Sequence, residues 1–136
     1  MAAVQENLFD SASRFFKGLE TSSNLREYLQ QVDQKIQFAP TDGQAFHVSV
    51  SNGRVDIGAG AKYLEEAVDV LYITGDEASF AALLKGDISL AESIYYLKIQ
   101  VAGYRNKEPR IAGFSKLLRL AVWDLTRGSR MLMPER

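Results

Sequence analysis

The side chains that could perform catalysis are few and scattered in this sequence. The chain contains one histidine, His47, and no cysteine, so it offers no thiolate, disulfide or cysteine nucleophile. A zinc site takes several His, Cys or carboxylate ligands, and a Ser–His–Asp triad would have to use His47 although the sequence has no Gly-x-Ser-x-Gly elbow. We therefore predict no catalytic residue, no metal site and no cofactor, and expect that the protein is not an enzyme.

Two aspartates, Asp56 and Asp69, are the candidates for a general base, because both lie among apolar residues of predicted strands. The polar side of an alternating strand is the ordinary place for such residues, so a surface position is the simpler interpretation. A small cone-shaped isomerase or cyclase of the α+β type is the less favoured alternative. It requires Asp56 or Asp69 to be buried beside a cavity.

Apolar residues recur along the chain with the periods of helices and strands. Capping boxes are expected at Asn24–Glu27 and Ser89–Glu92, where each would begin a helix. The pair Asn52–Gly53 predicts a tight hairpin turn, since both residues accept a positive φ. Alternation predicts strands at residues 35–38, 46–50, 54–57, 68–73 and 98–101.

The order of these elements is two helices, four strands, two helices, one strand and one helix. It predicts an α+β fold with a five-stranded, mostly antiparallel sheet covered by helices on one face. The last strand follows a helical excursion, so it can join the sheet away from the hairpin. No linker or repeat divides the sequence, and we expect residues 1–136 to form a single domain with an N-terminal helical extension over about residues 1–33.

The charge is close to balanced, at −1, but unevenly distributed. This balance argues against a nucleic-acid partner. The basic residues of the C-terminal third are Lys98, Arg105, Lys107, Arg110, Lys116, Arg119, Arg127, Arg130 and Arg136. A solvated helix surface is the simpler interpretation. The alternative is that this basic helix meets an anionic membrane surface or a partner enzyme.

Two apolar residues, Leu120 and Trp123, lie off the main apolar stripe of the last helix. If both are exposed, they would give that helix an edge for a membrane or a partner. The first residues contain no basic segment before an apolar run, and no stretch approaches ~18 consecutive apolar residues. We therefore expect a cytoplasmic protein.

Five segments together resemble, in order and spacing, the domains of the sterol carrier protein type 2 (SCP2) family. These are the hairpin 46–55, the strand and capped helix 68–80, the helix end 81–88, the strand 97–103 and the closing helix 114–118. The chain departs from the family pattern at Tyr96–Leu97, where members often carry Gly-Lys, and at Gly103–Tyr104, where they often carry Gly-Asp.

The resemblance implies a hydrophobic tunnel between the sheet and the helices. It also implies a non-catalytic carrier for a hydrophobic ligand such as a fatty acid, an acyl-CoA or a sterol, or an accessory subunit for an enzyme of lipid, steroid or quinone metabolism. Large apolar residues of the helices would line the tunnel, although the same periodicity suits a plain core. The expected lining residues are Phe80, Leu83, Leu84, Ile88, Ile94, Tyr95, Ile111, Phe114, Leu117, Leu118 and Ala121.

Overall fold

The computed structural model describes residues 7–64, 67, 69–102 and 108–129, with no side-chain placement for residue 108 or residues 125–129. The elements are α1 (Leu8–Thr21), the short 3-10 helix η1 (Ser23–Leu25), α2 (Arg26–Leu29), β1 (Asp33–Pro40), β2 (Phe46–Ser51), β3 (Arg54–Ala59), β4 (Leu71–Gly75), α3 (Glu77–Lys85), α4 (Leu90–Tyr95), β5 (Ile99–Ala102) and α5 (Glu108–Ser129).

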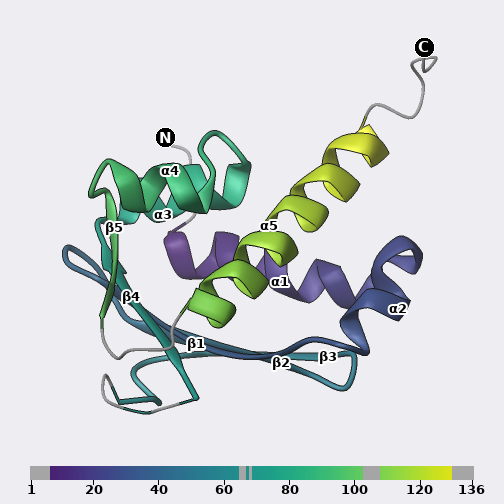
Figure 1. Ribbon diagram of the computed structural model, residues 1–136, viewed down its shortest axis with the longest axis horizontal. Helices are drawn as coiled ribbons and strands as arrows, with labels where there is room; N and C mark the ends of the chain where they lie inside the picture. Colours follow the sequence, from purple (N-terminus) through teal and green to yellow (C-terminus); the bar gives the residue numbers. More distant parts are fainter. Residues whose placement is uncertain (1–6, 65–66, 68, 103–107, 130–136) are drawn as a thin grey trace, which may run out of the picture.

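The five strands form one sheet in the order β3-β2-β1-β4-β5. Neighbouring strands are antiparallel except for the pair β1–β4, which is parallel. The strand β5 joins the sheet beside β4, at the edge opposite the hairpin, as expected from its position after two helices. The helices lie over one face of this sheet (Figure 1). The predicted α+β fold with a mostly antiparallel five-stranded sheet is therefore confirmed.

Local signals in the sequence correctly predict the hairpin and one helix start. Asn52 and Gly53 both have positive φ, at 54° and 79°, in the turn between β2 and β3. At the start of α4, Ser89 Oγ accepts a hydrogen bond from the Glu92 N–H at 3.0 Å, and Glu92 Oε1 accepts one from the Ser89 N–H at 3.2 Å. The capping box at Ser89–Glu92 is thus formed.

The other predicted capping box, Asn24–Glu27, is wrong. Asn24 lies inside η1, and its Nδ2 donates to Asp124 Oδ1 on α5 at 2.8 Å. Ser22 Oγ donates to the second oxygen of the same carboxylate, also at 2.8 Å. Asn24 therefore joins the N-terminal segment to α5 instead of capping a helix, because its backbone already lies inside η1 and an N-cap residue is non-helical.

The strand predicted at residues 68–73 begins later than expected. β4 starts at Leu71, and Asp69 lies before it, where its Oδ2 accepts a hydrogen bond from Lys35 Nζ at 3.0 Å. Residue 68 lies outside the described residues. The inward side chains of β4 are Leu71 and Ile73, which are fully buried, so the burial alternates from the first residue of the strand.

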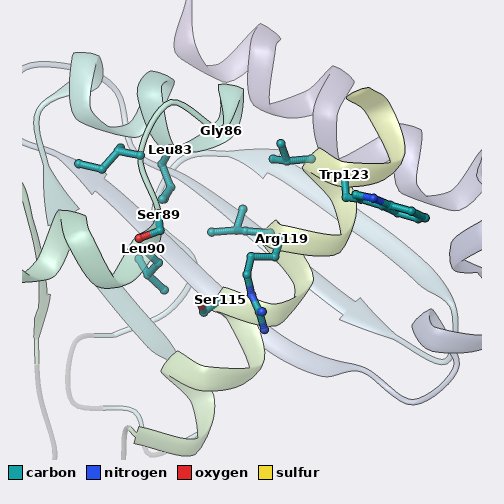
Figure 2. A pocket seen from close by; sticks show the side chains of 10 residues that line it. Leu83, Gly86, Ser89, Leu90, Ser115, Arg119 and Trp123 are labelled. Carbon is teal, nitrogen blue, oxygen red and sulfur yellow. The ribbon is translucent and has the colours of Figure 1, made fainter. Parts of the chain in front are cut away.

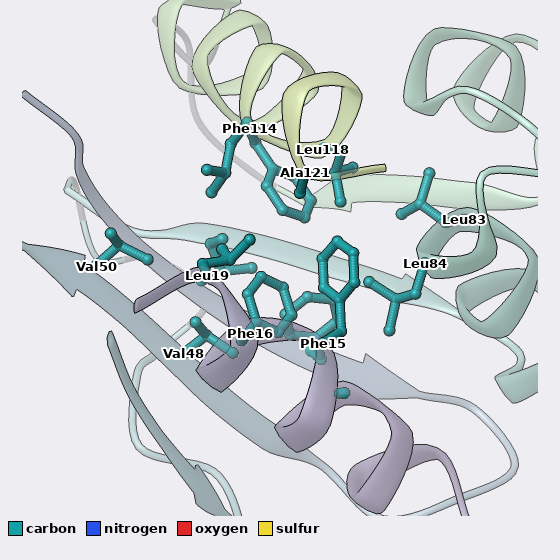
Figure 3. Close-up of a cluster of buried hydrophobic side chains, with 14 of the residues drawn as sticks. Phe15, Phe16, Leu19, Val48, Val50, Leu83, Leu84, Phe114, Leu118 and Ala121 are labelled. Carbon is teal, nitrogen blue, oxygen red and sulfur yellow. The ribbon is translucent and has the colours of Figure 1, made fainter. Parts of the chain in front are cut away.

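Phe38, in the central strand β1, forms the middle of a cluster of aromatic rings. Its ring stacks on Phe46 with centroids 4.5 Å apart, and it meets Phe16, Phe80 and Phe114 edge to face at 5.9, 5.4 and 6.2 Å. All five side chains are fully buried. Phe16 of α1 and Phe114 of α5 enter the same cluster from opposite sides (Figure 3). The core thus joins β1, β2, α1, α3 and α5 at one point.

The opposite face of the sheet carries one buried polar residue, Gln37. Its side chain, 1% exposed, donates from Nε2 to the Phe46 carbonyl at 3.0 Å. Its Oε1 accepts from the backbone N–H groups of Lys62 and Tyr63 at 2.9 and 3.0 Å. One amide therefore holds the start of the loop after β3 against the outer face of the sheet, and the buried polar group is fully used.

Replacing Gln37 with leucine should destabilise the protein by about 2–4 kcal/mol, because the N–H groups of Lys62 and Tyr63 lose their acceptor at a partly buried position. The measurement is the free energy of unfolding in urea. The exposed loop substitution Gln44→Leu is the control and should change it by about 0.5 kcal/mol at most. Equal effects of the two substitutions would contradict the assigned role of Gln37.

Candidate functional site

A mostly apolar cavity of about 240 Å³ lies between the α3–α4 connection and α5 (Figure 2). One wall consists of Leu83, Gly86, Ile88, Ser89 and Leu90, and the other of Ser115, Leu118, Arg119, Val122 and Trp123. Small-molecule sites are commonly concave and apolar, with a few polar groups that fix orientation. This cavity is therefore the candidate functional site.

The chain turns sharply between α3 and α4, and this turn forms one wall of the cavity. Gly86 ends α3 in the left-handed conformation, with φ of 83°, and the Asp87 N–H donates to the Ala82 carbonyl at 2.9 Å. A Cβ on Gly86 would lie 2.5 Å from Val122 Cγ1 of α5. The missing side chain therefore permits both the turn and the close approach of the two cavity walls.

α5 is held against the rest of the fold along its length. Near its start, a Cβ on Gly113 would lie 2.5 Å from Nε2 of Gln34 in β1, so the helix approaches the sheet closely there. In its middle, Leu117 and Ala121 are fully buried in the core. Further along, Asp124 accepts the two hydrogen bonds from the segment before α2. The cavity wall on α5 is thus fixed by both packing and hydrogen bonds.

The polar groups of the cavity are Ser89, Ser115 and Arg119. Ser89 is used in the capping box of α4. Arg119 is exposed and lies near Tyr28 of α2, where burial raises the pKa of the phenol and the positive charge of Arg119 lowers it in part. Lys116 Nζ lies 5.4 Å from the centre of the Tyr28 ring. The rim on α5 is therefore positively charged.

The predicted lining residues fall into three groups. Leu83, Ile88 and Leu118 line the cavity. Phe80, Leu84, Phe114, Leu117 and Ala121 are buried in the core cluster, and Ile94 and Ile111 are partly buried against it. Tyr95 is 78% exposed, and its ring contacts that of Tyr96 at 4.9 Å. The residues expected around a tunnel therefore do not share one lining.

The cavity also lies in a different place from the one expected. The resemblance implied a tunnel between the sheet and the helices, but there the rings around Phe38 pack against one another. The cavity found here lies between helices. The sequence prediction missed Gly86, Ser89, Leu90, Ser115, Arg119, Val122 and Trp123 as lining residues. One signal was available, since Ser115, Arg119 and Val122 recur at four- and three-residue spacings beside the core stripe.

The prediction that Leu120 and Trp123 form an exposed edge on α5 is correct for Trp123 only. Trp123 is 52% exposed, but Leu120 is partly buried and packs against the core. Because Leu117 and Ala121 point into the core, Leu120 between them also reaches its border. Lys116 and Arg119 are exposed beside Trp123. The side chain of Arg127 lies outside the described residues.

The residues considered for catalysis do not line the cavity. His47 Nδ1 lies 3.0 Å from the Gly60 carbonyl oxygen, and a Cβ on Gly58 would meet the His47 ring at 2.7 Å. Asp56 and Asp69 are both exposed. An isomerase of the kind considered above needs one of these carboxylates buried beside a cavity, so its central requirement is not met.

The described residues contain neither a metal site nor a membrane span. Within them, no group of three or more His, Cys, Asp or Glu side chains is arranged to hold a metal ion. In the same part of the chain, no helix combines the length and the apolar character needed to cross a membrane.

Comparison with solved structures identifies the fold. A crystal structure of sterol carrier protein 2 matches with a TM-score of 0.58 and 14% identity, covering 86% of this chain and 95% of that one. A possible sterol carrier protein from Thermus thermophilus matches with a TM-score of 0.57 and 14% identity, over 89% and 91% of the two chains. The UbiJ-SCP2 ubiquinone synthesis protein matches with a TM-score of 0.56 and 16% identity, covering 82% of this chain and 85% of that one.

A larger enzyme contains a similar region. A sec-alkyl sulfatase variant matches with a TM-score of 0.52 and 12% identity over 65% of this chain, which spans 14% of the length of that enzyme. No protein-family model and no curated protein matches the sequence. At such low identities the similarity concerns the fold alone, and the chain has the SCP2 fold that the sequence resemblance predicted.

Gly86→Ala should destabilise the protein by about 1–3 kcal/mol, because an L side chain at positive φ is strained and would also press against Val122. Gly18→Ala in α1 is the matched control. A Cβ on Gly18 meets nothing within 4 Å, so this change should instead stabilise the helix by about 0.5–1 kcal/mol. Thermal melting of both variants tests whether Gly86→Ala lowers stability while Gly18→Ala raises it. A stabilising effect of Gly86→Ala would refute the close approach of α3 to Val122 of α5.

The N-terminus of α3 should make stability depend on acidic pH. Asp76 Oδ1 accepts a hydrogen bond from the Ser79 N–H at 2.8 Å, and hydrogen bonding to the Ser79 side chain, together with this backbone bond, lowers the pKa of Asp76 below its usual value of 3.8. The stabilising contribution is therefore present above the unfolded pKa and is lost as pH falls through the folded pKa.

Asp76→Ser keeps an acceptor at this cap but does not titrate. Urea unfolding of the wild-type protein and of this variant between mildly and strongly acidic pH measures the difference. We expect the wild-type protein to lose more stability on acidification. Parallel pH profiles would show that Asp76 contributes nothing through its charge.

Proposed function

We propose that the protein is a non-catalytic carrier that binds one hydrophobic molecule, such as a fatty acid, an acyl-CoA or a sterol, in the cavity between α3–α4 and α5. The observation that carries this proposal is the lining of the cavity, in which apolar side chains predominate over three polar ones. Burial of apolar ligand surface there would supply about 25 cal/mol per Å². The SCP2 fold supports the proposal, since neighbours of that fold carry the name sterol carrier protein.

The size of the cavity limits what can enter it. A cavity of roughly 150 Å³ accommodates benzene, whereas sites for drug-sized ligands span roughly 300–1,000 Å³. At about 240 Å³, the site accommodates part of an acyl chain or a small ring system. A longer ligand would extend past the rim, where the half-exposed Trp123 lies beside Val122.

The chemistry of the site favours binding over catalysis. Its hydroxyl and guanidinium groups include no pair of titratable side chains that could exchange protons with a substrate. In this proposal residues 1–136 act as one ligand-binding domain in the cytoplasm, which agrees with a sequence free of cysteine.

A second candidate function is that of an accessory subunit that supports a partner enzyme. One surface favours it, because Trp123 is 52% exposed beside the exposed Lys116 and Arg119, and aromatic and arginine side chains are common at interfaces. The same basic surface would suit an anionic membrane. One structural neighbour is called a ubiquinone synthesis protein, which agrees with a role beside an enzyme that handles an apolar substrate.

Binding of the fluorescent fatty acid cis-parinaric acid tests the carrier proposal. The wild-type protein should show saturable binding. Ser115→Leu places a larger apolar side chain in the cavity and should weaken binding by about tenfold or more, or about 1.4 kcal/mol. Ala112→Leu makes a similar change at an exposed position of α5 that does not line the cavity, and it should leave binding unchanged. No binding by the wild-type protein, or equal binding by all three proteins, would refute the proposal.

A further inference from the structure

The cavity contains a single charge, and its position is informative. Of the ten residues that line the cavity, Arg119 alone is charged. It lies on α5 between Ser115 and Trp123, and Figure 2 shows its side chain extending along the helix toward the level of Ser115. An apolar cavity with one cation at its rim is electrostatically complementary to a molecule with an apolar body and one anionic end.

The carboxylate on α5 whose side chain is described is used elsewhere. Asp124, the nearest described carboxylate along α5, accepts hydrogen bonds from Ser22 and Asn24. Two ion pairs of the described residues join Lys17 to Glu20 and Lys35 to Asp69, and neither includes Arg119. Within that part of the chain, Arg119 therefore has no carboxylate partner, and its planar fork of donors is available to a ligand.

The neighbouring groups strengthen the positive field at the rim. Lys116 lies one turn before Arg119 and is exposed. Tyr28 lies close to both, and because burial raises the pKa of its phenol, it carries no negative charge at neutral pH. Ser115 adds a hydroxyl donor that lines the cavity four residues before Arg119. No group among these would repel an anion.

We propose that Arg119 anchors the anionic head of a free single-chain amphiphile, a carboxylate or a phosphate, whose chain lies between Leu83 and Leu118 in the cavity. This inference rests on the proposed carrier function and narrows its ligand class. Arginine binds both oxyanions through paired, charge-assisted hydrogen bonds. A sterol, whose polar end is a neutral hydroxyl, would leave the guanidinium without an anionic partner.

Calorimetric titration with four amphiphiles of equal chain length tests the anchor. Decanoate and decyl phosphate carry the proposed head, decanol is neutral, and decyltrimethylammonium is cationic. At neutral pH and low salt, the wild-type protein should bind both anions about tenfold more tightly than decanol, and the cation most weakly. Tighter binding of decanoate or of decyl phosphate identifies which of the two heads the site prefers.

Two substitutions on α5 test whether Arg119 itself binds the anionic head or whether any positive charge on the helix has the same effect. Arg119→Gln should weaken the binding of both anions about tenfold, so that the variant no longer distinguishes an anionic head from the neutral head of decanol. Lys116→Gln removes the same charge from the same helix at a position that does not line the cavity, and should change anion binding by less than about threefold. Thermal melting of each variant verifies that it is folded.

The possible outcomes distinguish the two proposals. If no amphiphile binds to the folded wild-type protein, the carrier function fails and the anchor fails with it. If decanol binds as tightly as decanoate, or if Lys116→Gln weakens anion binding as much as Arg119→Gln does, the carrier function stands and Arg119 is not the anchor.

Discussion

The packing of the Phe38 ring determines where the helices of this protein can lie. Phe38 is in the central strand, and the rings in contact with it come from α1, β2, α3 and α5. Because cores are packed as densely as organic crystals, these rings fill the middle of the layer between the sheet and the helices. The cavity lies beside this cluster, between α3–α4 and α5, where Gly86 lets the two walls approach.

The sequence was sufficient where the determining interactions are local. The Asn52–Gly53 turn and the Ser89–Glu92 capping box depend on residues at most three apart, and both are formed. The order of helices and strands followed from periodicity, and the late entry of β5 followed from that order. The resemblance to SCP2 domains added the correct fold, which local patterns alone describe only as an α+β class.

The sequence was insufficient where distant segments compete for the same space or the same hydrogen bond. Asn24 is suited to capping a helix, yet it lies inside η1, and its amide donates to Asp124, a hundred residues away. Gln37 occupies a strand position that suits a surface residue, but it is buried, where its amide bonds to one backbone group of β2 and two of the loop after β3. The position of the cavity depends on how five rings from different elements pack together, which periodicity cannot reveal.

In the proposed carrier, a rigid aromatic core positions α5 and the α3–α4 connection as the walls of an apolar site. The most direct test is methyl NMR of the protein with bound decanoate, because it locates the chain of the ligand. We predict intermolecular contacts between the methylene groups of decanoate and the methyl groups of Leu83, Leu118 and Val122. Contacts with exposed residues such as Leu97 alone, or none at all, would contradict a binding site between these helices.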